Sequence, residues 1–238
     1  MSTLILTAHG SRDPRSAANA HAVAAQLKSM RPGLDVRLAF LELNEPNLTE
    51  VLAASSDRHR TVVAPLLLAG AYHARLDIPA QIARAGAHGV RRAEVLGEDD
   101  RLVTVLRERL AELGVSPHDD DLGVMVVATG SSNAAANART ARVASMLALG
   151  AEWVSATTAF ATRRDQSVSR ATGYLRRQGA RRLVIAPWFL APGLLTDGVL
   201  KFARHSGIPM AAPLGAHRLV AETVLDRYEQ ALAEPHAA

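Results

Sequence analysis

The 238-residue sequence contains no cysteine, and this absence removes several classes of site at once. Without thiols the chain has no disulfide, no iron–sulfur cluster, no thiolate metal site and no cysteine nucleophile. Any metal ion must therefore be held by His, Asp or Glu side chains or by solvent.

Long apolar runs are also missing, although 48% of the residues are hydrophobic. No run approaches the about 18 residues that a membrane-spanning helix needs. The apolar stretch 1–10 lacks the basic leader and the length of a signal peptide. We therefore expect a cytoplasmic protein.

Lysine is nearly absent, because 25 of the 27 basic residues are Arg. The net charge of +4 is uneven: residues 1–121 hold 14 basic and 16 acidic side chains, and residues 122–238 hold 13 and 7. The halves thus carry −2 and +6. Arg pairs well with carboxylates and phosphates, so the second half suits an anionic partner, although an Arg-biased composition alone produces the same excess.

Short apolar runs alternate with stretches of helical periodicity along the chain. This alternation predicts an α/β fold with parallel sheets covered by helices on both faces. The expected strands of the first half are Leu4–Ala8, Val36–Leu41, Thr61–Leu67 and Ala93–Leu96, and helices follow from Pro14, Asn47, Asp77 and Asp99. Residues 114–121 are polar, break both periodicities and are predicted to form a linker.

The same pattern restarts after the linker, which indicates an internal duplication. The strand Leu122–Ala128 repeats Leu4–Ala8 at an offset of 120, and Val184–Ala191 repeats Val62–Ala69 at an offset of 122. We therefore predict two tandem, duplicated parallel-sheet domains of the flavodoxin-like or Rossmann-like kind. Their expected bounds are 1–115 and 122–238.

The two halves differ at the ends of their strands. The first half carries two imidazoles and a carboxylate that the second half lacks. These are His9, Glu42 and His73, matched with Thr129, Thr162 and Leu195. His73 lies eight residues beyond Pro65, and Leu195 lies eight residues beyond Pro187. Glu45 is matched with Asp165, so this acidic position is retained.

The carboxyl ends of parallel strands open onto one edge of a sheet, so His9, His73 and Glu42 or Glu45 are expected to converge. Imidazole suits divalent iron, cobalt, nickel or zinc, and a carboxylate completes such a site or takes up protons. A single His after a strand is usually a surface residue. The prediction of a metal site depends on the fact that His9 and His73 lie at matched strand ends in the first half and that the second half lacks both.

Three segments of the first half match a known pattern, namely residues 6–12 around His9-Gly10-Ser11, residues 40–46 and residues 65–79. Their order and spacing resemble the sirohydrochlorin chelatases of the CbiX and SirB type, the class II chelatases. The resemblance implies two α/β chelatase domains facing each other across a cleft. It also implies insertion of a divalent metal, Fe²⁺ or Co²⁺, into sirohydrochlorin, towards siroheme or cobalamin, with no permanently bound cofactor. Ni²⁺ is a third metal that imidazole ligands accept.

The resemblance further implies roles for individual residues. His9 and His73 bind the metal, and His9 accepts a proton. With Glu42, which comes from the comparison of the strand ends, these two residues form the predicted catalytic set. The substrate contacts are Ser11, Arg12, Glu45, Leu68, Ala69, Gly70, Ala71, Tyr72 and His73. Many family members have a second His where this chain has Gly70.

The implied chemistry agrees with the residues. Metallation releases two pyrrole N–H protons, so the site needs bases that work near pH 7, as His does. The family's substrates carry eight carboxylates, which suits the basic residues near strand ends of the second half, namely Arg139, Arg142, Arg163 and Arg164. We expect a monomer, rather than an obligate dimer, that binds sirohydrochlorin and neither nucleic acid nor membrane.

Two other functions stay open. A non-enzymatic carrier would bind Co²⁺ or Ni²⁺ through His9 and His73, but it needs neither the apolar loop 68–72 nor a basic second half. A flavodoxin-like nucleotide-binding protein would hold phosphates at the turns Gly10-Ser11 and Gly130-Ser131, which leaves the His pair unexplained.

Overall fold

Strands and helices alternate along most of the chain in the computed structural model, which describes residues 2–55, 58–70, 76–163 and 167–234. The first half contains β1 (Thr3–Ala8), α1 (Pro14–Met30), β2 (Asp35–Phe40), α2 (Leu48–Ala53), the 3₁₀ helix η1 (Arg58–Arg60), β3 (Thr61–Pro65), α3 (Ile78–Arg84), β4 (Arg91–Arg92) and α4 (Asp100–Ala111). The second contains β5 (Leu122–Ala128), α5 (Ala134–Ala148), β6 (Ser155–Phe160), α6 (Val168–Arg177), β7 (Arg182–Pro187), α7 (Leu194–His205) and α8 (Arg218–Ala233).

The strands form two parallel sheets, in the orders β2-β1-β3-β4 and β6-β5-β7. The central strands β1 and β5 are buried along nearly their whole length, as expected for parallel strands with helices on both faces. The predicted α/β class with two parallel sheets is confirmed.

The strand registers repeat the duplication seen in the sequence. In the first sheet Ala8 pairs with Phe40, and in the second Ala128 pairs with Phe160. Likewise, Thr7 pairs with Pro65 and Val127 with Pro187. The offsets of 120 and 122 therefore describe equivalent positions in space, and the predicted duplication is confirmed.

The fourth strand is shorter and earlier than the predicted Ala93–Leu96, because ladder pairing covers only Arg91 and Arg92. The chain still follows β3 beyond this point, since the Ala93 and Leu96 amides donate to the Val63 and Leu67 carbonyls at 2.9 Å each. In the second sheet the corresponding place holds a single bridge between Ile185 and Met210.

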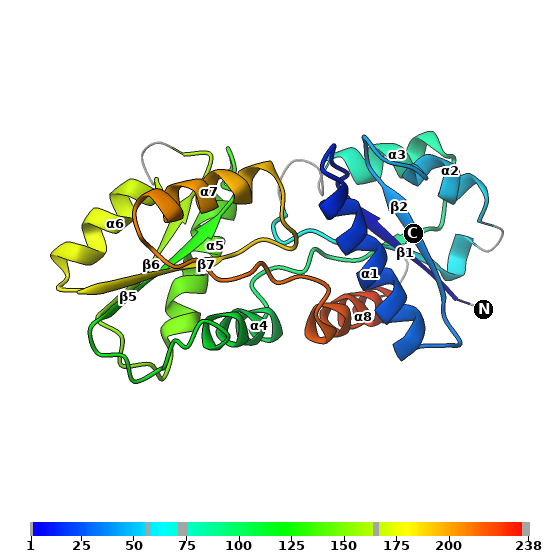
Figure 1. The fold of residues 1–238 in the computed structure, drawn as a ribbon. Coiled ribbons are helices and arrows are strands. Elements are labelled where there is room, and N and C mark those ends of the chain that lie inside the picture. The colour runs from blue at the N-terminus through cyan, green and yellow to red at the C-terminus, as the bar shows by residue number, and fades with distance from the viewer. Residues whose placement is uncertain (1, 56–57, 71–75, 164–166, 235–238) are drawn as a thin grey trace. The chain divides into compact units, whose positions relative to one another are not determined.

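Contacts divide the chain into two compact units that differ from the halves 1–115 and 122–238. Unit 1 comprises residues 1–97 and 216–238, and unit 2 comprises residues 98–215. The last helix of each half packs in the other unit: α8 lies against α1 and β3, and α4 lies against α5 and β7. Figure 1 shows orange-red α8 beside blue α1.

Hydrogen bonds from side chains hold α8 in place in unit 1 and α4 in place in unit 2. In unit 1, Gln26 Nε2 donates to the Ala216 carbonyl before α8, and an Arg91 nitrogen donates to the Leu232 carbonyl at its end. In unit 2, Arg107 of α4 donates to the Met146 carbonyl at the end of α5. Among the described helices, none is long and apolar enough to cross a membrane.

Candidate functional site

The structure brings together two of the predicted site residues, His9 and Glu42. His9 follows β1 and Glu42 follows β2, which are adjacent strands with the same direction. Imidazole Nδ1 lies 3.3 Å from Glu42 Oε1, with the two side chains 38% and 53% exposed. The sheet edge thus places a base and a carboxylate in contact at a solvent-accessible position.

The two nitrogens of His9 have different surroundings. Nδ1 is buried against the protein and faces Glu42, although more than a third of the side chain is exposed. A carboxylate beside one imidazole nitrogen is a common arrangement at metal sites, where it orients the ring of the ligating histidine.

Close backbone packing between the loops after β1 and β2 sets this geometry. The Leu41 and Glu42 amides donate to the Ala8 and His9 carbonyls, both at 3.0 Å. Gly10 adopts φ +98°, and a Cβ on it would lie 1.7 Å from the Glu42 carbonyl oxygen. Only glycine allows the two loops to approach this closely.

Asn44 is a positioning residue that the sequence interpretation missed. Its Oδ1 accepts a hydrogen bond of 2.7 Å from the Ser11 amide and so ties the His9-Gly10-Ser11 turn to the loop carrying Glu42. The Ser11 hydroxyl in turn accepts from the Asp13 amide, next to the start of α1. The only sign of this role in the sequence was an Asn located between Glu42 and Glu45.

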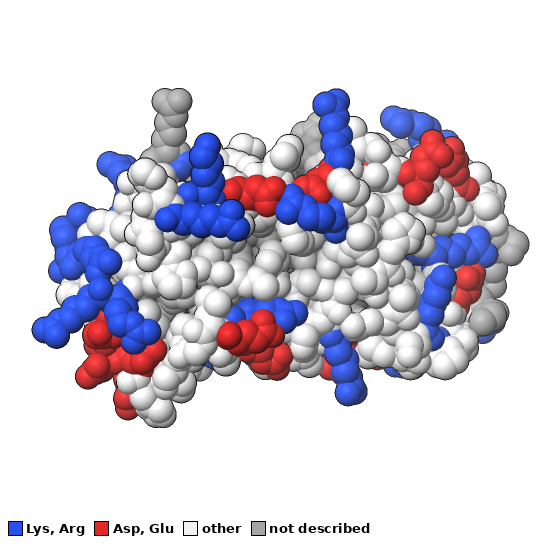
Figure 2. All heavy atoms as spheres, in the orientation of Figure 1, with Lys and Arg blue, Asp and Glu red and all other residues white. Residues whose placement is uncertain are grey.

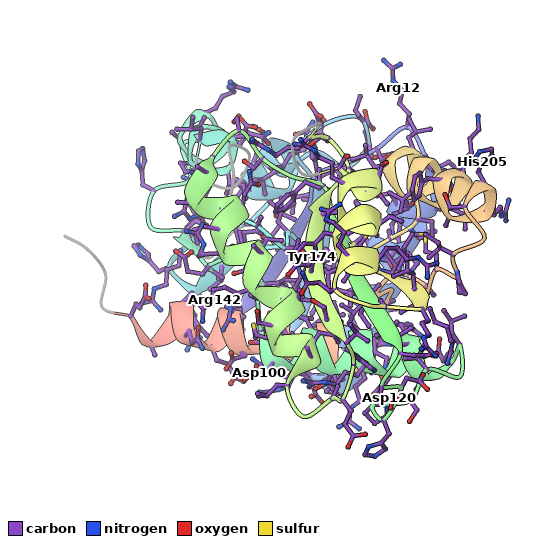
Figure 3. All side chains as sticks on the ribbon, turned by 90° about the vertical axis from the view of Figure 1, so that its left-hand side faces the viewer. Arg12, Asp100, Asp120, Arg142, Tyr174 and His205 are labelled. Carbon is purple, nitrogen blue, oxygen red and sulfur yellow. The ribbon has the colours of Figure 1, made fainter. Side chains whose placement is uncertain are left out.

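The structure also shows where the other residues predicted to contact the substrate lie. Arg12 is exposed, and in Figure 3 its side chain extends away from the ribbon into solvent. Glu45 is exposed in the loop between β2 and α2. Residues 68–70 follow β3 and are half-buried, and among the described residues a Cβ on Gly70 would meet Val95, at 3.7 Å.

His73, Tyr72 and Ala71 lie outside the described residues, so their predicted place at this edge stays a prediction. Within the described parts of the chain, no group of three or more His, Asp or Glu residues is placed to hold a metal ion. His9 and Glu42 therefore supply two members of the predicted site.

A polar pocket of about 220 Å³ adjoins Glu42. It is lined by Leu41, Glu42, Asp77, Ala80, Gln81 and Arg84, from the end of β2 and from α3. Gln81 Nε2 donates to the Leu41 carbonyl at 2.9 Å, which anchors α3 beside the site. Asp77 precedes α3 without capping it, unlike Asp13 and Asp99 at the starts of α1 and α4.

The equivalent edge in the second half has the same backbone but no imidazole or carboxylate in place of His9 and Glu42. The Thr162 amide donates to the Thr129 carbonyl at 3.0 Å, as the Glu42 amide does to His9. The Thr162 hydroxyl also donates to the Thr129 carbonyl, at 2.6 Å. The predicted matches of His9 with Thr129 and of Glu42 with Thr162 therefore hold in space.

The difference in net charge between the two units is smaller than the difference between the two halves of the sequence, because each unit contains the last helix of the other half. Unit 2 holds 14 basic and 11 acidic residues, a net charge of +3, which leaves +1 for unit 1. Most of the acidic residues of unit 2 lie in 98–121. On the face shown in Figure 2, blue side chains gather over α6 and α7, with a red group beside those over α7 and further red groups lower down.

The fold and the His9–Glu42 pair together define a duplicated α/β protein with an imidazole–carboxylate site at one sheet edge. Residues 3–113 and 123–231 match the family model described as CbiX, and the chain belongs to this family. The two matched segments correspond to the two repeats. The family resemblance found in the sequence is confirmed.

Relatives with established names support this assignment. The chain is 28% identical over 208 residues to the sirohydrochlorin ferrochelatase of Priestia megaterium, covering 84% of this chain and 77% of that one. It is 24% identical over 251 residues to the sirohydrochlorin cobaltochelatase of the same organism, covering 98% and 80%. The solved structure of SirB from Bacillus subtilis with Fe³⁺ is similar with a TM-score of 0.81 at 25% identity, over 98% of this chain and 96% of that one.

Proposed function

We propose that this protein is a chelatase that inserts Fe²⁺ or Co²⁺ into sirohydrochlorin. The observation that carries the proposal is the contact between His9 Nδ1 and Glu42 Oε1, at 3.3 Å, at the strand ends of one repeat only. Membership of the CbiX family and the names of the ferrochelatase and cobaltochelatase relatives support it.

The chemistry needs a metal ligand and a proton acceptor in one place. Insertion replaces two pyrrole N–H bonds with bonds from nitrogen to the metal and releases two protons. His9 holds the arriving ion through Nε2, while Glu42 keeps the ring oriented through Nδ1. Once the ion has passed to the macrocycle, His9 accepts one of the two protons and the other passes to solvent.

The remaining assignments belong to the same proposal. His73 supplies the second imidazole, and residues 68–73 line the tetrapyrrole together with Ser11, Arg12 and Glu45. The repeat 1–115 carries the chemistry, whereas the repeat 122–238 contributes basic side chains. The protein works as a cytoplasmic monomer, without nucleic acid or membrane partners. Ni²⁺ is a third metal to test, because imidazole and carboxylate ligands accept it.

The test is to mix the purified protein with sirohydrochlorin and Fe²⁺ or Co²⁺ without oxygen and follow the tetrapyrrole absorption spectrum. We expect metal insertion well above the uncatalysed rate, and a loss of about 100-fold or more in His9→Ala and His73→Ala. The exposed His88 gives a matched control, since His88→Ala should retain full activity.

Two results would contradict the proposal. A wild-type rate equal to the uncatalysed rate would exclude a chelatase, and metal binding without insertion would instead favour the carrier. Full activity in both His9→Ala and His73→Ala would leave the enzyme but reject this site.

A further inference from the structure

Among the described strands, the sheet of unit 2 has one open side, which runs along the edge strand β6. On the opposite side the segment 209–211 covers β7: the Ile185 amide donates to the Pro209 carbonyl at 2.8 Å, and the Ala211 amide donates to the Ile185 carbonyl at 2.9 Å. β6 pairs with β5 and with no other described strand. Alternate amides and carbonyls of β6 therefore point away from β5, as they do at a sheet edge.

The open side of β6 is accessible. Its first four residues, 155–158, are half-buried, whereas every residue of the central strand β5 is buried. The Thr158 hydroxyl donates to the Ala141 carbonyl at 3.1 Å, so α5 borders this edge. Ala138 and Ala141, one turn apart on α5, are small and exposed, so this helix adds little bulk beside β6.

The corresponding edge strand of unit 1, β2, carries a charge pair that β6 lacks. Arg37 Nε lies 2.8 Å from Asp35 Oδ2. Charged side chains on an edge strand protect it from pairing with another chain. The strand registers place Thr157 and Ser155 at these two positions in unit 2, at the offset of 120. β6 itself contains neither a charged residue nor a proline.

The helix that packs on β6 is basic. α6 contains three Arg residues and no acidic residue. The helix caps match its start with that of α2, because Asn47 caps the Glu50 amide and Ser167 caps the Arg170 amide. Arg170 therefore stands where the first repeat has Glu50, and the charge at this position is reversed.

Tyr174 lies on the side of α6 next to the open edge. In Figure 3 it lies between green α5 and yellow α6, and its side chain is 40% exposed. Arg170, Tyr174 and Arg177 follow one another at spacings of four and three residues, so they share one face of the helix. A Cβ on Gly173 would lie 3.3 Å from Arg177 Nη1, so this guanidinium lies back along α6. The open edge is thus bordered by an aromatic ring between two Arg residues.

We propose that the open side of β6, bordered by Arg170, Tyr174 and Arg177, binds an extended acidic segment of a partner protein as an additional strand. Backbone hydrogen bonds to β6 supply affinity, and the Arg side chains select acidic residues. The same charge disfavours a second copy of this chain, because antiparallel pairing of β6 with β6 brings two Arg-rich α6 helices together. The surface lies wholly within unit 2, along the side of its sheet.

The test measures peptide binding to the full-length protein by fluorescence anisotropy. The probe is a fluorescein-labelled peptide of alternating Glu and Val, about seven residues long, as a typical strand is. We expect it to bind about tenfold or more tightly than the same peptide with Lys in place of Glu, with a difference that narrows at about 0.5 M salt. The Glu peptide N-methylated at its central amides keeps its charge but loses its donors, so its Kd should rise about tenfold or more.

The first variant reverses the charge beside the edge. Arg170→Glu restores the residue of the first repeat, and with the N-cap Ser167 it completes a capping box, so α6 should stay folded. We expect the Kd for the Glu peptide to rise about fivefold or more. The matched control is Lys201→Glu, an exposed residue of α7 with the same change of charge, whose Kd should stay within about twofold of wild type.

The second variant alters the edge strand without changing the net charge. Ser155→Asp combined with Thr157→Arg reproduces the ion pair that Asp35 and Arg37 form on β2. We expect it to raise the Kd for the Glu peptide about tenfold or more, because charged side chains on an edge oppose the addition of a strand.

Three results would overturn the inference, and none of them depends on metal insertion. The Glu peptide fails to bind, or it binds equally well after N-methylation. Arg170→Glu and Lys201→Glu weaken binding equally, which would reduce the effect to net charge. Sedimentation shows a dimer that the doubly substituted edge abolishes, which would assign this edge to a second copy instead of an acidic partner.

Discussion

The candidate site depends at the residue scale on which carboxylate touches His9. The sequence left Glu42 and Glu45 as alternatives, because both follow β2 within a few residues. The structure places Glu42 Oε1 at 3.3 Å from the imidazole, whereas Glu45 is exposed further along the loop. We therefore predict that Glu42 orients the imidazole and that Glu45 contacts the substrate.

This difference predicts separate kinetic effects for two conservative variants. Glu42→Gln should lower kcat by about 10- to 100-fold, because the ring loses its charged partner. Glu45→Gln should mainly raise the KM for sirohydrochlorin. Steady-state kinetics with each variant check this, and an unchanged kcat in Glu42→Gln would contradict an orienting role.

Gly10 sets the approach of the two loops, and its replacement tests how much stability that approach requires. Gly10→Ala should destabilise the fold by about 2–4 kcal/mol, because a Cβ meets the Glu42 carbonyl and φ is positive. Urea unfolding measures the change. Gly33→Ala is the control, since no atom of the described residues lies within 4 Å of a Cβ there and its effect should be small. Equal stability of both variants would be inconsistent with the close approach.

At the scale of elements, the placement of α8 is the feature that the sequence described least well. The periodicity of α8 predicts an amphipathic helix, and Val220, Ala221 and Val224 are indeed buried. Two similar sheets were available to cover, however, and periodicity does not distinguish them. Only the contacts show that α8 packs on α1 and β3.

Tyr228 reports on the docking of α8 through the pH dependence of stability. Burial raises the pKa of Tyr228 above its ordinary value of 10.0, because the neutral phenol is favoured in the folded state. The unfolded chain ionises first as pH rises, so this contribution to stability is complete below pH 10 and is lost through the folded pKa.

Tyr228→Phe should therefore weaken the fall in unfolding free energy above pH 10, measured by chemical denaturation across this range. Tyr174→Phe, at a tyrosine of α6 that is 40% exposed, is the matched substitution measured beside it. Identical alkaline curves for wild type and Tyr228→Phe would show that α8 is not docked through a buried phenol.

At the scale of the whole molecule, the chain is a duplication whose halves exchange their last helices. Each sheet is completed by a helix from the other half, so residues 1–115 contain one unit's sheet without the helix α8 that covers it. Folding of either unit therefore depends on contacts between residues far apart in the sequence.

Hydrogen exchange measured by mass spectrometry should reveal this dependence. Val224→Ala in α8 should speed amide exchange in β1 and β3, and Leu106→Ala in α4 should speed it in β5 and β7. Both side chains are fully buried, and Leu106→Ala should cost about 2–5 kcal/mol. If each variant instead affected the sheet of its own half, the exchange of helices would be wrong.

The local pattern of the sequence was sufficient to predict most of the fold. Apolar runs such as Leu4–Ala8 mark strands because a buried parallel strand needs apolar residues on both faces, and repeats at offsets of 120 and 122 marked the duplication. It also indicated His9 and Glu42, since strand ends of a parallel sheet share one edge. The role of His73 stays a prediction.

The tertiary structure decided what depends on contacts between distant residues. It selected Glu42 over Glu45 by distance and added Asn44 through its bond to the Ser11 amide. It also assigned α4 and α8 to opposite units. Periodicity records which face of a helix is apolar, and it carries no information about which of two similar sheets that face will cover.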